Sequence, residues 1–213
     1  ARSNFESAAK DDLPEAFCSL GEMALKGIGC EKDAIAAAEY YMQANSSEGT
    51  HNYESIVENL NADDKASLGL KIKNNKSLSK YNKFAFALFQ AAASMGHVPS
   101  LNHMGTCLWK GHGVNVNEPE ALKNFNLAAE KGNGGAYINL GNFHAHGQLG
   151  LKIDHVQAKT CYQKAIDFGR IDAYYWLGKL YEQADTAKAR EYYEKGANLN
   201  EPRSKAELAR MGS

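Results

Sequence analysis

Four sets of residues recur at matching positions along this chain, and their recurrence constrains the fold more than any other feature. The first set pairs a large apolar residue with glycine: Leu20-Gly21, Leu68-Gly69, Met104-Gly105, Leu140-Gly141 and Leu177-Gly178. The second is an alanine that follows the glycine by 16 residues in three repeats, by 17 in the fourth and by 11 in the fifth: Ala37, Ala85, Ala121, Ala158 and Ala189. The third is an aromatic residue four positions later: Tyr41, Phe89, Phe125, Tyr162 and Tyr193. The fourth is a small residue three positions further on: Ala44, Ala92, Ala128, Ala165 and Gly196. A period of about 36 residues with this content predicts a stacked array of helix pairs.

The third repeat shows why these residues form paired helices. Its apolar residues at helical spacing define one face of a first helix: Leu101, Met104, Leu108 and Trp109. Gly105 lies inside that helix at a cost of about 1 kcal/mol relative to alanine, so a shared glycine here predicts close approach of a neighbouring helix. The glycines of Gly111-His112-Gly113 then end the first helix, and Glu118-Pro119-Glu120 begins the second.

These residues, in this order, resemble the Sel-one-like repeat, a relative of the tetratricopeptide repeat. Its pattern is A-x-x-x-L-G, then G-x-G, then K-A-x-x-Y-x-K-A; residues 136–141 and 158–165 match the first and last parts closely, and the third and fourth repeats match best. The resemblance covers nearly the whole chain. It implies an all-α fold, a right-handed α-solenoid of stacked antiparallel helix pairs, and no enzyme activity.

The repeats divide the chain into one solenoid of residues 1–213, which we interpret as part of a longer array. The full repeats are predicted at residues 14–49, 64–96, 97–132, 133–169 and 170–197. A partial repeat at 1–13 is indicated by Ala1, Phe5 and Ala8, and another at 202–213 by Pro202 and by Met211-Gly212, which echo Met104-Gly105. An inserted segment at 50–63 is predicted to form a lengthened or extra helix.

Composition narrows the classes of partner. The chain has 24 basic and 25 acidic residues and a formal net charge of −1, which argues against nucleic acid. No run of 18 apolar residues predicts a membrane span. We find no G-x-S-x-G, P-loop or G-x-G-x-x-G motif, and no cofactor is expected.

Histidines, cysteines and asparagines offer weaker signals. Six of the seven histidines fall between His97 and His155, but no metal-ligand spacing is present, so no metal site is predicted. The four cysteines are Cys18, Cys30, Cys107 and Cys161; buried free thiols are the favoured interpretation, and a bridge between Cys18 and Cys30 stays open. Asn45 and Asn75 fit the glycosylation triplet.

The tetratricopeptide resemblance also implies where a partner would bind. First helices line the concave face of such arrays, and their inward positions lie three before, one after and four after the shared glycine. These positions and one adjacent residue give the predicted partner-binding set: Asn102, Thr106, Trp109, Ile138, Asn142, His146, Tyr175, Lys179 and Glu182. Ala145 holds the remaining position. The alternative interpretation is that Trp109 and Tyr175 complete the packing between repeats.

The leading hypothesis is therefore a non-enzymatic scaffold or adaptor that binds a protein or peptide on its concave face. The resemblance implies roles in complex assembly or in ER-associated degradation. One alternative is a secreted or lumenal recognition module, acting in host–microbe contact or as an immunity protein to a toxic enzyme. Another is a structural repeat that forms a homodimer. The ER lumen, the periplasm or exterior, and the cytoplasm all stay open as compartments.

Overall fold

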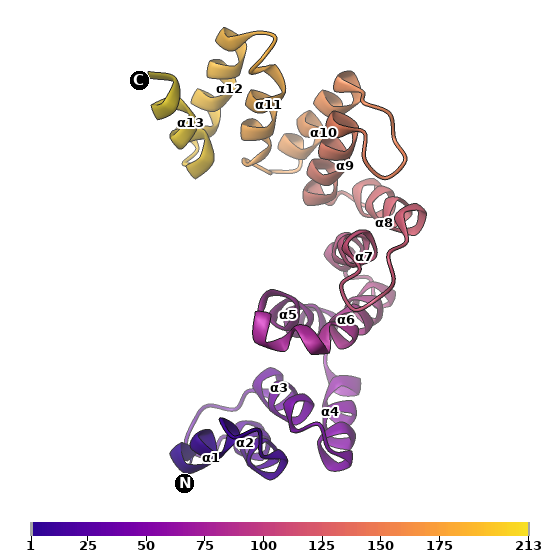
Figure 1. Cartoon of the computed structure of the whole chain (residues 1–213), viewed down its shortest axis with the longest axis vertical. Coiled ribbons are helices and arrows are strands. Elements are labelled where there is room, and N and C mark those ends of the chain that lie inside the picture. Colours follow the sequence, from indigo (N-terminus) through magenta and orange to yellow (C-terminus); the bar gives the residue numbers. More distant parts are fainter. Residues whose placement is uncertain (1, 213) are drawn as a thin grey trace. The chain divides into compact units, whose positions relative to one another are not determined.

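The computed structural model describes residues 2–212, and all regular structure within them is helical (Figure 1). Ala1 and Ser213, which bound the two predicted partial repeats, lie outside the described residues. The chain divides into two compact units, an N-terminal unit that ends at Ser79 and a C-terminal unit that begins at Lys80. The all-α repeat architecture predicted from the sequence is thus confirmed.

The N-terminal unit contains five α-helices, in which α1 packs on α2, α2 on α3, and α3 on α4. They are α1 (Arg2–Ala9), α2 (Pro14–Lys26), α3 (Ala34–Ala44), α4 (Ser47–Asn59) and α5 (Ala62–Asn74). Helices α2 and α3 form a repeat hairpin, and α3 packs against both α4 and α5. Helix α4 is an extra helix, and it lies where the sequence predicts a lengthened or extra helix.

The C-terminal unit stacks eight α-helices in chain order. They are α6 (Asn82–Ser94), α7 (Val98–Lys110), α8 (Glu118–Glu130), α9 (Gly134–His146), α10 (His155–Asp167), α11 (Ala173–Tyr181), α12 (Thr186–Asn198) and α13 (Pro202–Gly212). The short 3-10 helix η1 (Lys76–Tyr81) runs into this unit. Each helix packs on the next, and α11 also contacts α9 and α13, which makes α9, α11 and α13 successive first helices on one face. We call the surface formed by α7, α9 and α11 the first-helix face.

The predicted glycine turns end the first helices. Gly27, Gly111 and Gly147 each follow a helix directly with a left-handed backbone, at φ values of 75°, 71° and 65°. Each donates its backbone N–H to a carbonyl four residues earlier, which closes the last turn. The second helix that follows begins after an Asp or Asn cap. At α8 the cap is Asn117, whose side-chain oxygen accepts a hydrogen bond from the backbone N–H of Glu120.

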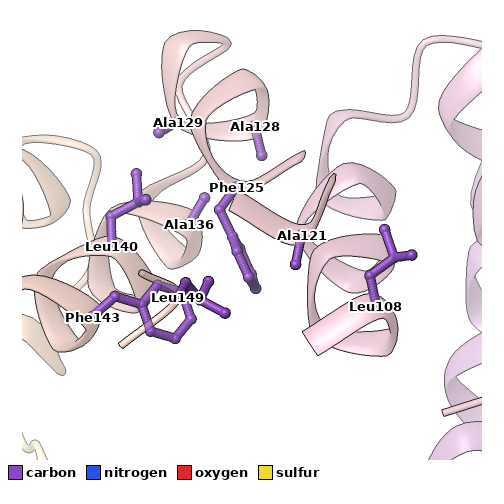
Figure 2. Close-up of a cluster of buried hydrophobic side chains, with 9 residues drawn as sticks. All are labelled: Leu108, Ala121, Phe125, Ala128, Ala129, Ala136, Leu140, Phe143 and Leu149. Atoms are coloured by element: carbon purple, nitrogen blue, oxygen red, sulfur yellow. The ribbon is translucent and has the colours of Figure 1, made fainter. Parts of the chain in front are cut away.

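The recurring alanines and aromatics form the core between successive helices. Figure 2 shows one such cluster, contributed by α7, α8, α9 and the loop after α9: Leu108, Ala121, Phe125, Ala128, Ala129, Ala136, Leu140, Phe143 and Leu149. The rings of Phe125 and Phe143 lie 5.1 Å apart, so the aromatic of one second helix contacts the first helix of the next repeat. The small residues allow this approach because alanine adds only one carbon to the helix surface.

The shared glycine accommodates the aromatic ring of its own repeat. A Cβ atom added at Gly105 would lie 3.0 Å from the Phe125 ring, and one at Gly21 would lie 2.9 Å from the Tyr41 ring. At Gly141, three ring atoms of Tyr162 would lie within 3.0 Å. The predicted close approach at this glycine is confirmed, and the approaching group is the aromatic side chain of the paired helix.

Helix α13 begins at Pro202, as expected, but its register differs from the one that Met211-Gly212 indicates. Ser204 is fully buried and lies against Gly196, eight residues earlier, just as Ala136 follows Ala128 by eight residues. The apolar–glycine pair of this repeat therefore corresponds to Leu208-Ala209. The matching of Met211-Gly212 to Met104-Gly105 is wrong because burial, rather than the local dipeptide, sets the register.

Candidate functional site: a pocket on the first-helix face

A pocket of about 590 Å³ opens on the first-helix face between α9, α10 and α11. Its walls come from the last turn of α9, one face of α10, and one face of α11 with the turn that follows. The lining residues are Ala145, His146, His155, Tyr162, Tyr175, Trp176, Lys179, Leu180, Glu182, Gln183 and Ala184. We call this the α9–α11 pocket.

The glycine of each repeat positions the aromatic floor of this pocket. The Tyr162 ring lies against Gly141, and its hydroxyl reaches past the glycine to donate to Asn142 Oδ1 at 2.6 Å. Burial raises the pKa of the Tyr162 hydroxyl, which keeps it a protonated donor. Tyr162 is 1% exposed, so the α9–α10 hairpin fixes it before any partner binds.

Three aromatic rings meet at the pocket. The Tyr162 and Trp176 rings lie nearly parallel, at 14° and with centroids 6.5 Å apart. The Tyr175 ring stands nearly perpendicular to Trp176, at 72° and 5.1 Å. Rings held in this way offer large rigid contact surfaces at low cost in conformational entropy.

Charged side chains flank the aromatic rings in a balanced network. Lys179 Nζ lies 3.0 Å from Glu182 Oε2 and 3.0 Å from Glu207 Oε1 of α13. Arg210 of α13 pairs with Glu182 and, at 2.6 Å, with Glu207. The hydrogen bond to Glu182 is the main reason that the pKa of Lys179 is raised. Two cations and two carboxylates therefore compensate one another beside the pocket.

The structure brings four of the nine predicted partner-binding residues into this pocket. They are His146, Tyr175, Lys179 and Glu182. Asn142 lies next to it through its bond to Tyr162. This grouping arises because α9 and α11 carry equivalent positions of adjacent repeats on one face.

The remaining predicted residues lie outside the pocket. Asn102 Oδ1 accepts from Asn139 Nδ2 at 2.8 Å, which links α7 to α9, and Thr106 Oγ1 donates to the Asn102 carbonyl at 3.0 Å. Ile138 is 6% exposed and belongs to a core cluster with Tyr162. Trp109 is half-buried and packs its ring edge-on against Phe143 at 4.9 Å. Trp109 thus completes packing between repeats, as the alternative interpretation expects.

Several pocket residues lie outside the three positions around the shared glycine from which the partner-binding residues were predicted. Trp176 lies two positions before the shared glycine, in a column where the third and fourth repeats have His103 and Asn139. The available signal was a tryptophan at a repeat position that the other repeats fill with smaller polar residues. Leu180, Gln183 and the α10 residues carry no such signal, because their place in the pocket depends on how α9 and α11 diverge.

The other chemical candidates give no second site. Residues 2–212 contain no group of three His, Cys, Asp or Glu side chains placed to hold a metal ion. All four cysteines are free thiols; only Cys107 is buried, so the expectation of burial is wrong for Cys18, Cys30 and Cys161, which are half-exposed. None of the described helices has the length and apolar character that crossing a membrane requires.

Comparison with known proteins identifies the repeat. The family model described as Sel1 repeat matches residues 14–46, 78–97, 98–133, 135–167 and 171–201. These matches cover most of the chain, which therefore belongs to the Sel1 repeat family. The first match contains the α2–α3 hairpin, and the last three contain the α7–α8, α9–α10 and α11–α12 hairpins.

Two curated relatives and one solved structure extend this result. The chain is 36% identical over 73 residues to the chitin synthase regulator SKT5 of Saccharomyces cerevisiae, a match covering 34% of this chain and 10% of that protein. It is 35% identical over 85 residues to HRD3B of Arabidopsis thaliana, described as an ERAD-associated E3 ubiquitin-protein ligase component, over 40% of this chain and 14% of that protein. A Sel1 repeat protein from Oxalobacter formigenes has a similar structure, with a TM-score of 0.64 and 27% identity over 92% of this chain and 75% of that one. The chain spans at most 18% of the length of the curated relatives it matches.

Proposed function

We propose that this chain is a non-enzymatic interaction module that binds a protein or peptide partner on its first-helix face, at a site centred on the α9–α11 pocket. The observation that carries the proposal is the pocket itself, which gathers His146, Tyr175, Lys179 and Glu182 around a rigid aromatic floor. Aromatic residues beside a few polar groups are the composition of binding hot spots.

The similar proteins support an adaptor role. SKT5 is named as a regulator of another protein, and HRD3B as a component of a ligase. Both descriptions concern proteins that act together with others. We extend that role to this chain as assembly of a protein complex, which needs no catalytic residues of its own.

Polar groups beside the pocket suit an extended partner. Asn102 and Asn139 link neighbouring first helices, and Asn142, on the same helix as Asn139, bonds to Tyr162 of the pocket floor. Side-chain amides both donate and accept hydrogen bonds, so such a row can pair with the main chain of a peptide. The proposed site thus combines a side-chain pocket with main-chain recognition along α7 and α9.

Capture from the native source tests the proposal. The chain is used as bait beside Tyr175→Ala, which changes the pocket, and Tyr192→Ala, which removes a half-buried tyrosine from α12 outside the pocket. A partner lost with Tyr175→Ala and kept with Tyr192→Ala supports the proposal, provided that both variants keep their helical circular dichroism. A partner kept equally by both contradicts it.

A further inference from the structure

Helix α11 already binds two arginine side chains of its own chain. Arg203 of α13 lies with its Cζ atom 4.5 Å from the centroid of Tyr175 and 5.6 Å from that of Trp176. Arg210, seven residues further along α13, pairs with Glu182. Guanidinium groups stack on aromatic rings and pair with carboxylates, so α11 presents both kinds of partner that arginine prefers.

The groups that contact these arginines also line the α9–α11 pocket. Tyr175 and Trp176 of α11 and Glu182 directly after it all contribute to its wall, and the buried Tyr162 ring lies parallel to Trp176 and supports it. On the side of α11 that faces α13, Arg203 stacks on Tyr175 and Trp176, and Arg210 pairs with Glu182. On the side of α9 the corresponding space is open, because α9 presents the short side chain of Ala145 there.

The backbone at the pocket also favours a cation. Helix α9 ends at His146 and α11 ends at Tyr181, so the carbonyl ends of two helices lie at the pocket, against the N–H end of one, α10, which begins at the lining residue His155. Each helix C-terminus carries a partial negative charge of roughly half an electron, which attracts positive groups. Lys179 and Arg210 share the carboxylates of Glu182 and Glu207, so this network adds no net positive charge beside the pocket.

We propose that the α9–α11 pocket takes the guanidinium group of an arginine side chain from the partner polypeptide. The guanidinium lies against the aromatic wall and shares the Glu182 carboxylate with Lys179 and Arg210. Its aliphatic stem packs on Ala145 and Leu180. This inference rests on the proposed function, since it names the chemistry of the partner that the first-helix face binds.

A blocked tripeptide, acetyl-Gly-Arg-Gly-amide, tests this directly. The chain has two tryptophans, so in a Trp109→Phe variant the indole N–H signal in a proton–nitrogen NMR spectrum comes from Trp176 alone. We expect a saturable shift of that signal at constant ionic strength. The same peptide with citrulline, which has the shape of arginine without its charge, is expected to bind at least about tenfold more weakly.

Two variants locate the contact. Glu182→Gln is expected to weaken arginine-peptide binding by about tenfold, whereas Glu194→Gln, an exposed carboxylate on α12, leaves it unchanged. Equal binding of the citrulline peptide, equal affinity of the two variants, or no shift at concentrations up to about 50 mM overturns the inference. A shift given only by the corresponding glutamate or phenylalanine peptide also overturns it, in favour of an acidic or apolar occupant.

The inference and the proposed function fail separately. If capture of a native partner requires Tyr175 but the arginine peptide does not bind, the arginine inference is overturned and the proposed interaction site stands. A native partner indifferent to Tyr175→Ala overturns the proposed site whatever the tripeptide does.

Discussion

Replacement of Gly141 by alanine tests the packing of glycine against an aromatic ring that organises each repeat. The added Cβ would bring three atoms of the Tyr162 ring within 3.0 Å, where ordinary contacts lie at 3.4–4 Å. Tyr162 is 1% exposed and its hydroxyl is bonded to Asn142, so the ring cannot move away from the added atom without straining that bond and its contact with Trp176. Either these contacts weaken or α9 and α10 separate locally.

The size of the effect follows from three contributions. Overpacking a core costs about 1–3 kcal/mol, and a single added carbon places this case near the middle of that range, at about 2 kcal/mol. A weakened Tyr162–Asn142 hydrogen bond adds about 1 kcal/mol, while the better helix propensity of alanine returns about 1 kcal/mol. The expected net loss is about 2 kcal/mol, which corresponds to a fall in Tm of roughly 4–8 °C for a chain of this size.

Thermal and urea unfolding followed by far-ultraviolet circular dichroism measure this loss. Tyr162→Leu removes the ring, so in that background Gly141→Ala is expected to stabilise the protein by about 1 kcal/mol through helix propensity, giving a coupling energy of about 3 kcal/mol. Gly212→Ala is the control, since no atom lies within 4 Å of its added Cβ. If Gly141→Ala raises the stability of the parent protein, helix propensity outweighs contact and the reasoning is refuted.

Three further predictions concern caps, charge and thiols. Asp154→Ala removes the carboxylate that accepts from two backbone N–H groups at the start of α10, and is expected to lower the unfolding free energy by about 1 kcal/mol; an unchanged urea midpoint would contradict this. Burial opposes ionisation of the Glu201 carboxyl, but hydrogen bonds from Ser204 and Arg203 outweigh the burial and lower its pKa from 4.5. The ionised carboxylate therefore stabilises the fold fully above pH 4.5, and this stabilisation is lost as the pH falls through the lowered pKa. The protection of α13 amides from exchange, taken relative to the intrinsic rate at each pH, should therefore fall on acidification, and less so in Glu201→Gln. Cys107 is expected to resist a maleimide until unfolding, while half-exposed Cys30 reacts in the native state; equal rates would be inconsistent with the packing around α7.

The repeat residues determine most of the fold because they act locally. Gly111 ends its helix through a left-handed backbone, Pro202 begins another, and Phe125 packs against Gly105 within a single hairpin. Each of these interactions joins residues about 20 positions apart or fewer. Sequence spacing was therefore sufficient to predict the helix pairs and their glycine contacts.

Only part of the pocket lining could be predicted, because the pocket depends on how α9, α10 and α11 are placed relative to one another. The columns around the glycine gave Tyr175, Lys179 and Glu182, but they also gave Ile138 and Trp109, which pack in the core clusters. A position one residue away on a helix turns by about 100°, so small differences in helix tilt decide which column faces the opening. Such tilts arise from packing between repeats, so the sequence of a single repeat does not show them.

Site-specific crosslinking in the native source tests the central claim, that a partner binds on the first-helix face, most directly. Tyr175 is replaced by the photoreactive p-benzoyl-L-phenylalanine, and Tyr192 is replaced in the same way as the matched position on α12. The account predicts that one partner protein is crosslinked from position 175 and not from position 192. Crosslinking of that partner from position 192 alone, or with equal yield from both positions, would contradict it.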